Sequence, residues 1–384
     1  MNTETKKNLQ AAAILVGTIV GVGTFGIPYV FAQAGFFVGL GHLAALSAVM
    51  LAIHLMYGEI VLRTQEKHRF IGYADIYLGT WGRRIAIPMV VVGIFGTLLA
   101  YTIVGGNFTA LLFDPFVELS TVWWSLIFFA AMAFFIVTDF RTGAPAELLM
   151  NAVFLAVFTA LIGRSLPDIS AENIFAVHST SNFFLPYGVV LFAVAGSAAV
   201  PELRDVLMGD GRMRRVIIWG TLIPVALYAL FALAAVGVVG EATTPDAIGG
   251  LVARYGRWVA VAGGIVGALT TATSFIVLGL VLKHAFIYDL RVPKHISTML
   301  VLGVPLLLFA VSTHDFVKVI GFVGAVFGGI EGILMLKLHR AAKILGRRSP
   351  EYSLHIPSFA YYIIGALYVA GIGYEIAYTF LHRA

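Results

Sequence analysis

The sequence contains no cysteine and few charged residues. Without cysteine, the chain can form no disulfide bond, thiolate metal site or cysteine nucleophile. Charged residues make up 12% of the 384 positions, against about 25% in soluble globular proteins, and hydrophobic residues make up 60%. Because a soluble domain cannot bury so large a hydrophobic fraction, the composition predicts an integral membrane protein.

Motifs of enzyme active sites are missing as well. Neither HExxH nor GxSxG occurs in the chain, so we expect no enzyme activity and no bound cofactor. The sequence GVGTFG at residues 21–26 matches the dinucleotide fingerprint GxGxxG, but it lies inside an apolar stretch instead of between a strand and a helix. It therefore does not indicate a nucleotide site.

Eleven apolar blocks of about 18–28 residues fill most of the chain. An α-helix needs about this length to cross a hydrocarbon core about 30 Å thick. We therefore expect an all-α, multi-pass protein of the inner or plasma membrane, embedded in the lipid bilayer. The predicted spans are 9–35, 36–62, 84–113, 121–139, 145–163, 183–207, 213–239, 256–283, 296–313, 315–337 and 357–381.

Lysine and arginine are distributed unevenly over the connecting loops. With the N-terminus in the cytoplasm, 20 of the 25 Lys and Arg residues lie on the cytoplasmic side. The positive-inside rule therefore predicts a cytoplasmic N-terminus, and the odd number of spans places the C-terminus outside. The same bias explains the net charge of +5, so we expect no nucleic-acid partner.

The spacing of the spans indicates an internal repeat. The first five spans map onto the next five with an offset of about 172–177 residues. Because each half has five crossings, the second half must be inverted, as in secondary transporters. This predicts a first repeat at 1–163, an inverted repeat at 183–337 and an extra helix at 357–381. The alternative is that similar helix and loop lengths give this register by chance.

Glycine and proline interrupt two corresponding spans. The first contains GTIVGVGTFGIP at residues 17–28, and the sixth contains FAVAGSAAVPEL at residues 192–203. Inside a helix, glycine is less favourable than alanine by about 1 kcal/mol and proline by about 3 kcal/mol. In lipid, non-helical backbone is tolerated only where protein or a cavity covers it. We therefore predict that the first and sixth helices are broken at the midplane, around a central site.

These two motifs and the repeat resemble a known family of carriers. With ten of its eleven spans in a 5+5 repeat, the chain resembles the amino acid-polyamine-organocation superfamily, which has the leucine-transporter fold. It is most similar to the amino acid/auxin permease and hydroxy/aromatic amino acid permease branches. The resemblance covers almost the whole chain. It implies an amino acid symporter in which a bundle of helices 1, 2, 6 and 7 rocks against a scaffold of helices 3, 4, 8 and 9.

The resemblance also implies a substrate site at the two breaks. Backbone N–H groups of the first helix would bind the substrate carboxylate, and freed carbonyls of both helices would bind its ammonium. Tyr101 is a candidate donor to the carboxylate, although a tyrosine in a membrane span is more often a packing or interface residue. Phe192 is a candidate outer lid or, equally, an ordinary core residue. The residues assigned to the substrate in this way are Ile19, Val22, Gly23, Tyr101, Phe192, Ala193 and Gly196. Because residues 17–28 and 192–200 carry no charge, a neutral amino acid is favoured.

A run of hydroxyl residues in the eighth span is a candidate ion site. In sodium-coupled members of the superfamily, first-helix carbonyls and eighth-helix hydroxyls bind Na⁺. The ligands implied here are the carbonyls of Gly17, Val20 and Thr270 and the side chains of Thr273 and Ser274. The alternative is that these hydroxyls bond back to their own helix. Proton-coupled relatives can place a lysine in the fifth helix; its absence here disfavours H⁺ coupling without excluding it.

Four acidic residues lie in the cytoplasmic halves of their spans: Glu59, Glu147, Glu202 and Glu331. They are candidates either for a proton relay or for a cytoplasmic gate, and we favour the gate. The arginines available to pair with them are Arg63, Arg83, Arg84 and Arg204. His42 and His54 in the second span either titrate or, more commonly for such residues, simply bond to a neighbour.

Other functions remain less favoured. A channel would need a continuous pore lined by charged or carbonyl ligands, whereas paired breaks at one depth make an occluded site. A non-transporting amino acid sensor on the same fold has the same sequence features. The sequence therefore predicts a monomeric Na⁺-coupled symporter of a neutral amino acid, with H⁺ coupling and a sensor as the open alternatives.

Overall fold

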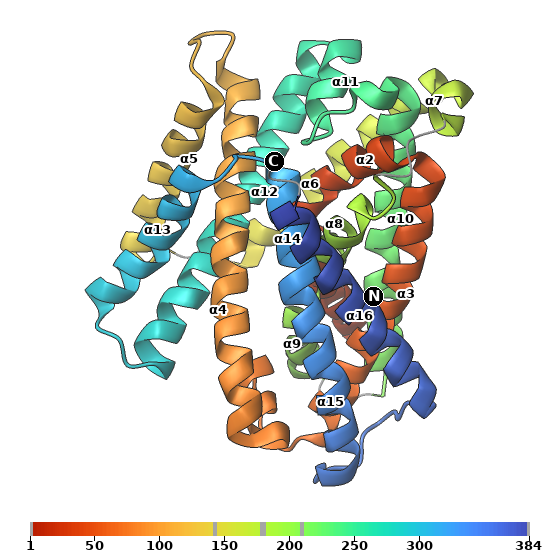
Figure 1. Ribbon diagram of the computed structural model, residues 1–384, viewed down its shortest axis with the longest axis vertical. Helices are drawn as coiled ribbons and strands as arrows, with labels where there is room; N and C mark the ends of the chain where they lie inside the picture. The colour runs from red at the N-terminus through yellow and green to blue at the C-terminus, as the bar shows by residue number, and fades with distance from the viewer. Residues whose placement is uncertain (1–2, 141–143, 177–181, 208–210, 382–384) are drawn as a thin grey trace.

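The computed structural model describes residues 3–140, 144–176, 182–207 and 211–381, and gives the backbone alone at 3–6, 144–149, 289 and 380–381. All regular elements in these ranges are helices, and the long ones form one elongated bundle (Figure 1). The α-helices are α1 (Thr3–Ile19), α2 (Gly23–Ala34), α3 (Phe36–Arg63), α4 (Phe70–Phe113), α5 (Thr121–Val137), α6 (Ala144–Ser165), α7 (Ala171–Phe175), α8 (Leu185–Ala193), α9 (Val200–Leu207), α10 (Met213–Val239), α11 (Ile248–Tyr255), α12 (Arg257–His284), α13 (Lys294–Val311), α14 (Phe316–Phe322), α15 (Gly329–Leu345) and α16 (Ser358–Leu381).

The membrane-spanning character predicted from composition is confirmed. Within the described ranges, nine helical segments are long and apolar enough to cross a membrane, and the bent pair α1 and α2 adds a tenth. Helix α5 is apolar but only 17 residues long. Predicted and observed boundaries agree closely, as for 213–239 and α10. The all-α multi-pass fold is therefore confirmed, whereas the count of eleven crossings stays a prediction.

The first span is broken where its glycines predicted. Helices α1 and α2 meet at an angle of 54°, and Val20, Gly21 and Val22 lie between them. Gly23, at the start of α2, lies against α8 so closely that an added Cβ would be 2.6 Å from the Cα atom of Ala193. Only glycine permits this approach, so the first break is a packing requirement as well as a weak point of the helix.

The sixth span is broken at the corresponding position. Helix α8 ends at Ala193, the next three residues are not helical, and a 3₁₀ turn, η3 (Ser197–Ala199), leads into α9. A Cβ on Gly196 would lie 2.5 Å from Cγ1 of Ile19 in the first span. Each break therefore contacts the other through a glycine, and the prediction of two paired breaks is confirmed.

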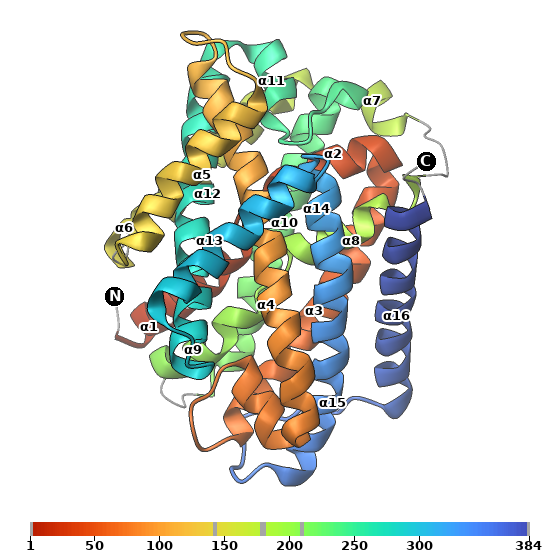
Figure 2. The same ribbon diagram turned by 60° about the vertical axis from the view of Figure 1, so that its left-hand side comes forward.

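The long helices fall into two packed groups. Helices α1, α2, α3, α8, α9 and α10 contact one another, and α4 packs against α5, α12 and α13. Helix α6 contacts both α10 and α12, and α15 contacts both α3 and α4, so these two helices join the groups. Helix α16 lies at the edge of the bundle beside α15 (Figure 2). This grouping is that of the bundle and scaffold implied by the family resemblance.

Two further interruptions shape the bundle. Helix α4 turns at Gly79, whose φ of 63° and ψ of −157° are accessible to glycine. Between α14 and α15 the chain forms a π-helical segment, η6 (Val323–Gly328). A Cβ on Gly188 of α8 would lie 2.1 Å from the carbonyl oxygen of Gly321 in α14, so these two helices touch through their backbones.

Candidate functional site

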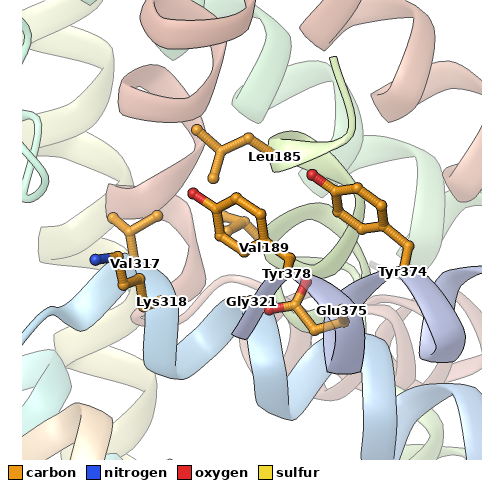
Figure 3. A pocket seen from close by; sticks show the side chains of 8 residues that line it. All are labelled: Leu185, Val189, Val317, Lys318, Gly321, Tyr374, Glu375 and Tyr378. Atoms are coloured by element: carbon orange, nitrogen blue, oxygen red, sulfur yellow. The ribbon is translucent and has the colours of Figure 1, made fainter. Parts of the chain in front are cut away.

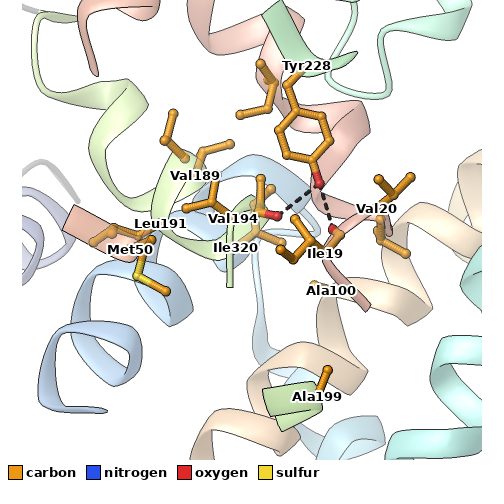
Figure 4. Packing of buried hydrophobic residues seen from close by; sticks show 14 of the residues in the cluster. Ile19, Val20, Met50, Ala100, Val189, Leu191, Val194, Ala199, Tyr228 and Ile320 are labelled. Carbon is orange, nitrogen blue, oxygen red and sulfur yellow. Dashed lines mark hydrogen bonds between the residues drawn. The ribbon is translucent and has the colours of Figure 1, made fainter. Parts of the chain in front are cut away.

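Of the three carbonyls predicted to bind the ammonium, those of Ile19, Phe192 and Ala193, the first and the last lie together at the meeting point of the breaks. The hydroxyl of Tyr228, in α10, is 2.6 Å from the carbonyl oxygen of Ile19 and 3.0 Å from that of Ala193 (Figure 4). All three residues are buried, with exposed fractions of 3% or less. The structure thus brings these two carbonyls to one point, and a tyrosine that the sequence did not single out donates its proton there.

The backbone N–H groups predicted to bind the carboxylate lie at the start of α2. Among the described residues, the N–H groups of Gly21 and Val22 have no hydrogen-bond acceptor. The first N–H of an α-helix has no acceptor within its own helix, which applies to Gly23. Free N–H groups with the positive end of the helix dipole suit an anion. The two ends of a zwitterion therefore find opposite backbone groups within a few residues of each other.

His54 of α3 binds the second break directly. Its Nε2 accepts the backbone N–H of Gly196 at 3.2 Å, and its Nδ1 is 3.0 Å from Oγ1 of Thr221 in α10. Since Nε2 accepts, the proton of a neutral ring sits on Nδ1 and is donated to Thr221. Nδ1 of His42 contacts the carbonyl of Val38. Both histidines are hydrogen-bonded, and Gly196 directs its N–H to a side chain.

Tyr101 and Phe192 lie on elements facing the breaks. Tyr101, in α4, is buried and its hydroxyl interacts with Ser274 of α12. Tyr101 is therefore paired with a predicted ion ligand. Phe192 is partly buried near the end of α8, where a Cβ on Gly324 would lie 2.6 Å from its backbone nitrogen. Its backbone thus packs against η6, and the roles of both residues toward a substrate stay predictions.

The predicted ion ligands are brought together in part. Oγ1 of Thr273 lies 3.1 Å from the carbonyl oxygens of both Leu269 and Thr270, and the hydroxyl of Thr271 donates to Gly267. These hydroxyls do bond back to their own helix, as the alternative interpretation expected. The main contacts of α1 are with α10 and α9, and those of α12 are with α4. An ion site that joins first-helix carbonyls to these hydroxyls stays a prediction.

An amide from the fifth span faces the first span at this level. A Cβ on Gly17 would lie 2.6 Å from Nδ2 of Asn151 in α6. Asn151 is not among the residues predicted from the sequence. Its signal is that it is the single amide side chain in this span.

Glu59 is the centre of a buried polar cluster at one end of α3. Its side chain is fully buried. It accepts hydrogen bonds from the next turn of α3, from α15 and from the segment that precedes α16. The donors are Nε of Arg63 at 2.9 Å, Oγ of Ser353 at 2.9 Å, N of Leu354 at 2.8 Å and Nε2 of His339 at 2.9 Å. Of the predicted arginine partners only Arg63 is seen here, and the cluster ties α16 to the repeat helices.

The other three candidate carboxylates do not join this cluster. Glu202 is half-exposed and lies 3.4 Å from Arg69. Glu331 is partly buried in α15, and its carboxyl interacts with the hydroxyl of Ser197 in the second break. Glu147 lies outside the residues whose side chains are described. A gate made of these residues, or a proton relay, stays a prediction.

The predicted arginine partners mostly bind elsewhere. Arg204 donates to the carbonyls of Val61, Thr64 and Gln65 at the end of α3, and Arg83 lies 3.9 Å from Asp75. Arg204 thus caps α3 with a cation, where the helix dipole favours one.

A fifth buried carboxylate was not anticipated. Glu375 of α16 is 8% exposed and lies beside Gly321 of α14, in a small pocket that α8, α14 and α16 form together (Figure 3). Tyr374 and Tyr378 line the same pocket, as does Lys318. Its signal in the sequence is a single acidic residue within the apolar span 357–381, and it is not among the four predicted carboxylates.

A cluster of ion pairs outside the site joins helices of the second helix group, which comprises α4, α5, α12 and α13. Nζ of Lys283 in α12 is fully buried, donates to the carbonyl of Ile136 in α5 and pairs with Asp139, both at 2.7 Å. Lys294 of α13 pairs with the same carboxylate at 2.7 Å. Hydrogen bonds from the two lysines lower the pKa of Asp139 from 3.8 to about 2. The cluster therefore joins α5, α12 and α13.

The paired breaks and the apolar helices define a membrane carrier of the leucine-transporter fold. The structure superposes on MhsT, solved in complex with L-phenylalanine, with a TM-score of 0.66 and 15% identity over 97% of this chain and 98% of that one. It also superposes on the inward-facing conformation of Mhp1, with a TM-score of 0.66 and 13% identity over 86% and 76% of the two chains. At these identities the likeness concerns the fold.

Sequence comparison assigns the family. The chain belongs to the tryptophan/tyrosine permease family, whose model matches residues 4–374. It is 26% identical over 356 residues to tyrosine-specific transport system 1 of Haemophilus influenzae, covering 86% of this chain and 87% of that protein. It is 21% identical over 333 residues to glutamine transporter 2 of Aliivibrio fischeri, covering 83% and 85%. The protein is therefore a multi-pass membrane transporter of amino acids.

Proposed function

We propose that this protein carries a neutral amino acid together with Na⁺ by alternating access, as a monomer with a cytoplasmic N-terminus. The observation that carries the proposal is the pair of opposite backbone groups at the breaks. The carbonyls of Ile19 and Ala193 converge on one point, and free N–H groups lie at Gly21 and Val22. An amino acid needs this pairing for its ammonium and carboxylate.

The absence of charge around the breaks supports a neutral side chain on the substrate. No acidic or basic residue occurs in residues 17–28 or 192–200, and a charged substrate side chain would need a buried partner. Two relatives are described as transporters of tyrosine and of glutamine, both of which have neutral side chains. Tyrosine is therefore the first substrate to test.

The pattern of exposure supports a site reached from one side at a time. Val22 and the first residues of α2, from Gly23 to Pro28, are buried. On the other side of the breaks, Thr18, Ala195 and Ala198 are exposed. In the predicted orientation this exposed side is cytoplasmic. Two inverted repeats, 1–163 and 183–337, provide the symmetry by which the opposite arrangement would arise.

Sodium is the proposed coupling ion. Na⁺ prefers several oxygen ligands close together, and Oγ1 of Thr273 lies 3.1 Å from the carbonyl of Thr270. A hydroxyl that donates to a carbonyl keeps lone pairs for a cation. The carbonyls of Gly17 and Val20 in α1 would complete the site together with Ser274 of α12. Proton coupling through a buried carboxylate is the alternative, and Glu375 joins the earlier candidates for it.

Uptake by purified protein in liposomes tests transport and coupling together. An inward Na⁺ gradient should drive accumulation of radiolabelled tyrosine, and replacing Na⁺ by choline should abolish it. Uptake that is unchanged when choline replaces Na⁺, but stops when a pH gradient is collapsed, would establish H⁺ coupling instead. Tyrosine binding without any uptake under either gradient would establish a sensor.

A pair of variants tests the ion ligands. The double substitution Thr273→Ala with Ser274→Ala should raise the half-saturating Na⁺ concentration at least several-fold. Thr271→Ala is the matched control, because its hydroxyl donates to Gly267 in the same helix and is not a predicted ligand. Equal Na⁺ dependence in all three proteins would remove these hydroxyls from the site.

A further inference from the structure

One side chain occupies the place that the proposed function assigns to the substrate ammonium. The hydroxyl of Tyr228 lies 2.6 Å from the carbonyl oxygen of Ile19 and 3.0 Å from that of Ala193 (Figure 4). An ammonium hydrogen bonds to carbonyls at about the same distances. The single hydroxyl hydrogen of Tyr228, in α10, is therefore shared between two carbonyls that the breaks leave without a helical partner.

The site around the Tyr228 hydroxyl is buried and leaves no room for a ligand beside it. Tyr228 has no exposed surface, and Ile19 and Ala193 are 3% and 2% exposed. Close contacts of Gly23 with Ala193, and of Gly196 with Ile19, bring the two broken helices together around the hydroxyl. No ligand reaches the two carbonyls unless the hydroxyl gives way.

The same hydroxyl holds the two broken spans together. Ile19 ends α1 and Ala193 ends α8, and α10 supplies the tyrosine. A buried carbonyl without a donor is unfavourable, so the ligand-free protein is stabilised by Tyr228. A substrate ammonium, with three donors and a charge, can replace this single hydroxyl and bind both carbonyls more strongly.

We propose that the Tyr228 hydroxyl stands in for the substrate ammonium: it bridges the breaks in the ligand-free protein, and the amino acid binds by displacing it from the Ile19 and Ala193 carbonyls. The inference rests on the proposed substrate site. It makes Tyr228 a residue that selects for ligands with an amino group. A ligand without that group leaves the hydroxyl in place and gains nothing from these carbonyls.

Binding measurements on Tyr228→Phe in detergent test the displacement. The variant keeps the aromatic ring and lacks the hydroxyl. The ligand tyrosine then no longer has to displace a hydroxyl from the two carbonyls, so the Kd of the variant for tyrosine should fall about three- to tenfold. The Kd of 3-(4-hydroxyphenyl)propionate, which is tyrosine without its amino group, should not change. A rise in the Kd of tyrosine, no change, or an equal change for both ligands would overturn the proposal.

Tyr368→Phe is the matched control. Tyr368 has no exposed surface, and its hydroxyl contacts the sulfur of Met50 and not the Ile19 or Ala193 carbonyl. This variant loses a buried tyrosine hydroxyl, so its Kd for tyrosine should equal that of the wild type. A fall as large as that of Tyr228→Phe would assign the effect to general loosening and contradict the proposal.

A second measurement needs no substrate. Without ligand, Tyr228→Phe should have a lower Tm than Tyr368→Phe, because two carbonyls lose their donor, and saturating tyrosine should remove the difference. If the wild type binds no amino acid at all, the proposed function fails. The bridge is still judged separately by the ligand-free Tm, and equal values for the two variants would overturn it.

Discussion

The outer and the cytoplasmic halves of the two broken spans are built differently, in the predicted orientation. In the outer halves, ten of the 12 residues of α2 and seven of the nine of α8 are buried. In the cytoplasmic half of the sixth span, α9, only three of eight are buried. The outer halves are therefore enclosed by protein, whereas the cytoplasmic halves stand more open.

The contacts differ in kind as well as in number. Two glycines of the outer halves meet the backbone of another helix, Gly23 against Ala193 and Gly188 against Gly321. At the cytoplasmic side, Gly17 faces the side chain of Asn151. Side chains can change rotamer and keep contact, whereas a backbone contact is either made or lost. We therefore expect α1 and α9 to move before α2 and α8 do.

The largest effect is expected at a close backbone contact of the outer half of the sixth span. Gly188→Ala places a Cβ 2.1 Å from the carbonyl oxygen of Gly321, and a backbone atom cannot turn aside. We expect a loss of about 3 kcal/mol or more in the free energy of unfolding, together with loss of uptake. Denaturant titration in detergent micelles measures the first, and liposome uptake the second.

A glycine with open surroundings provides the control. Gly163→Ala, in α6, meets nothing within 4 Å and should be neutral or stabilising by up to about 1 kcal/mol. If Gly188→Ala were as stable as Gly163→Ala, the outer halves would not be held by backbone contact.

The next effect concerns the polar cluster at the cytoplasmic end. Glu59→Gln removes a fully buried charge that accepts from Arg63 and His339, and the amide nitrogen that replaces one oxygen cannot accept. We expect the free energy of unfolding to fall by about 3 kcal/mol. The same titration measures it.

Glu202→Gln is the exposed counterpart. The Glu202 side chain is 52% exposed beside Arg69, so the change should be below about 1 kcal/mol. Small and equal effects of the two substitutions would show that the buried Glu59 carboxylate is no more important for stability than the exposed Glu202. The polar cluster around Glu59 would then not stabilise the cytoplasmic end of the bundle.

A smaller effect separates a backbone contact from a side-chain contact. Gly17→Ala places a Cβ 2.6 Å from Nδ2 of Asn151, but that amide can rotate away. We expect a loss of about 1 kcal/mol, and Asn151→Ala should restore most of it in the double variant. Strictly additive effects would show that the two residues do not interact in the folded protein.

The breaks and the helical class were predictable from the sequence because they depend on residue type alone. Glycine and proline weaken a helix wherever it lies, so residues 17–28 and Gly196 marked the breaks. Hydropathy also depends on residue type alone, and it therefore located nearly every span. Helix α5 shows the limit, since its 17 apolar residues leave its crossing undecided.

The side chains that bind the breaks were not predictable. Tyr228 lies 209 residues after Ile19, and His54 lies 142 residues before Gly196. Hydropathy shows that such residues lie in spans but not which face of a neighbouring helix they approach. The partners of Glu59 at Ser353 and Leu354 were hidden in the same way, since they come from a loop outside the repeat.

The smallest effect is expected in the second helix group, which provides a fixed reference for the broken spans. Asp139 binds Lys283 and Lys294, and these hydrogen bonds lower its pKa to about 2. A lowered pKa stabilises the folded state above the unfolded value of 3.8, and this contribution is lost as the pH falls toward 2. Asp139→Asn, which tolerates the local φ of 54°, should therefore reduce the free energy of unfolding by about 1 kcal/mol at pH 7 and by less near pH 3. Because α5, α12 and α13 do not contain the breaks, the stabilisation by saturating tyrosine should be the same in this variant as in the wild type. A smaller stabilisation by tyrosine would mean that this group also moves when substrate binds, and the division into moving and fixed helices would then lie elsewhere.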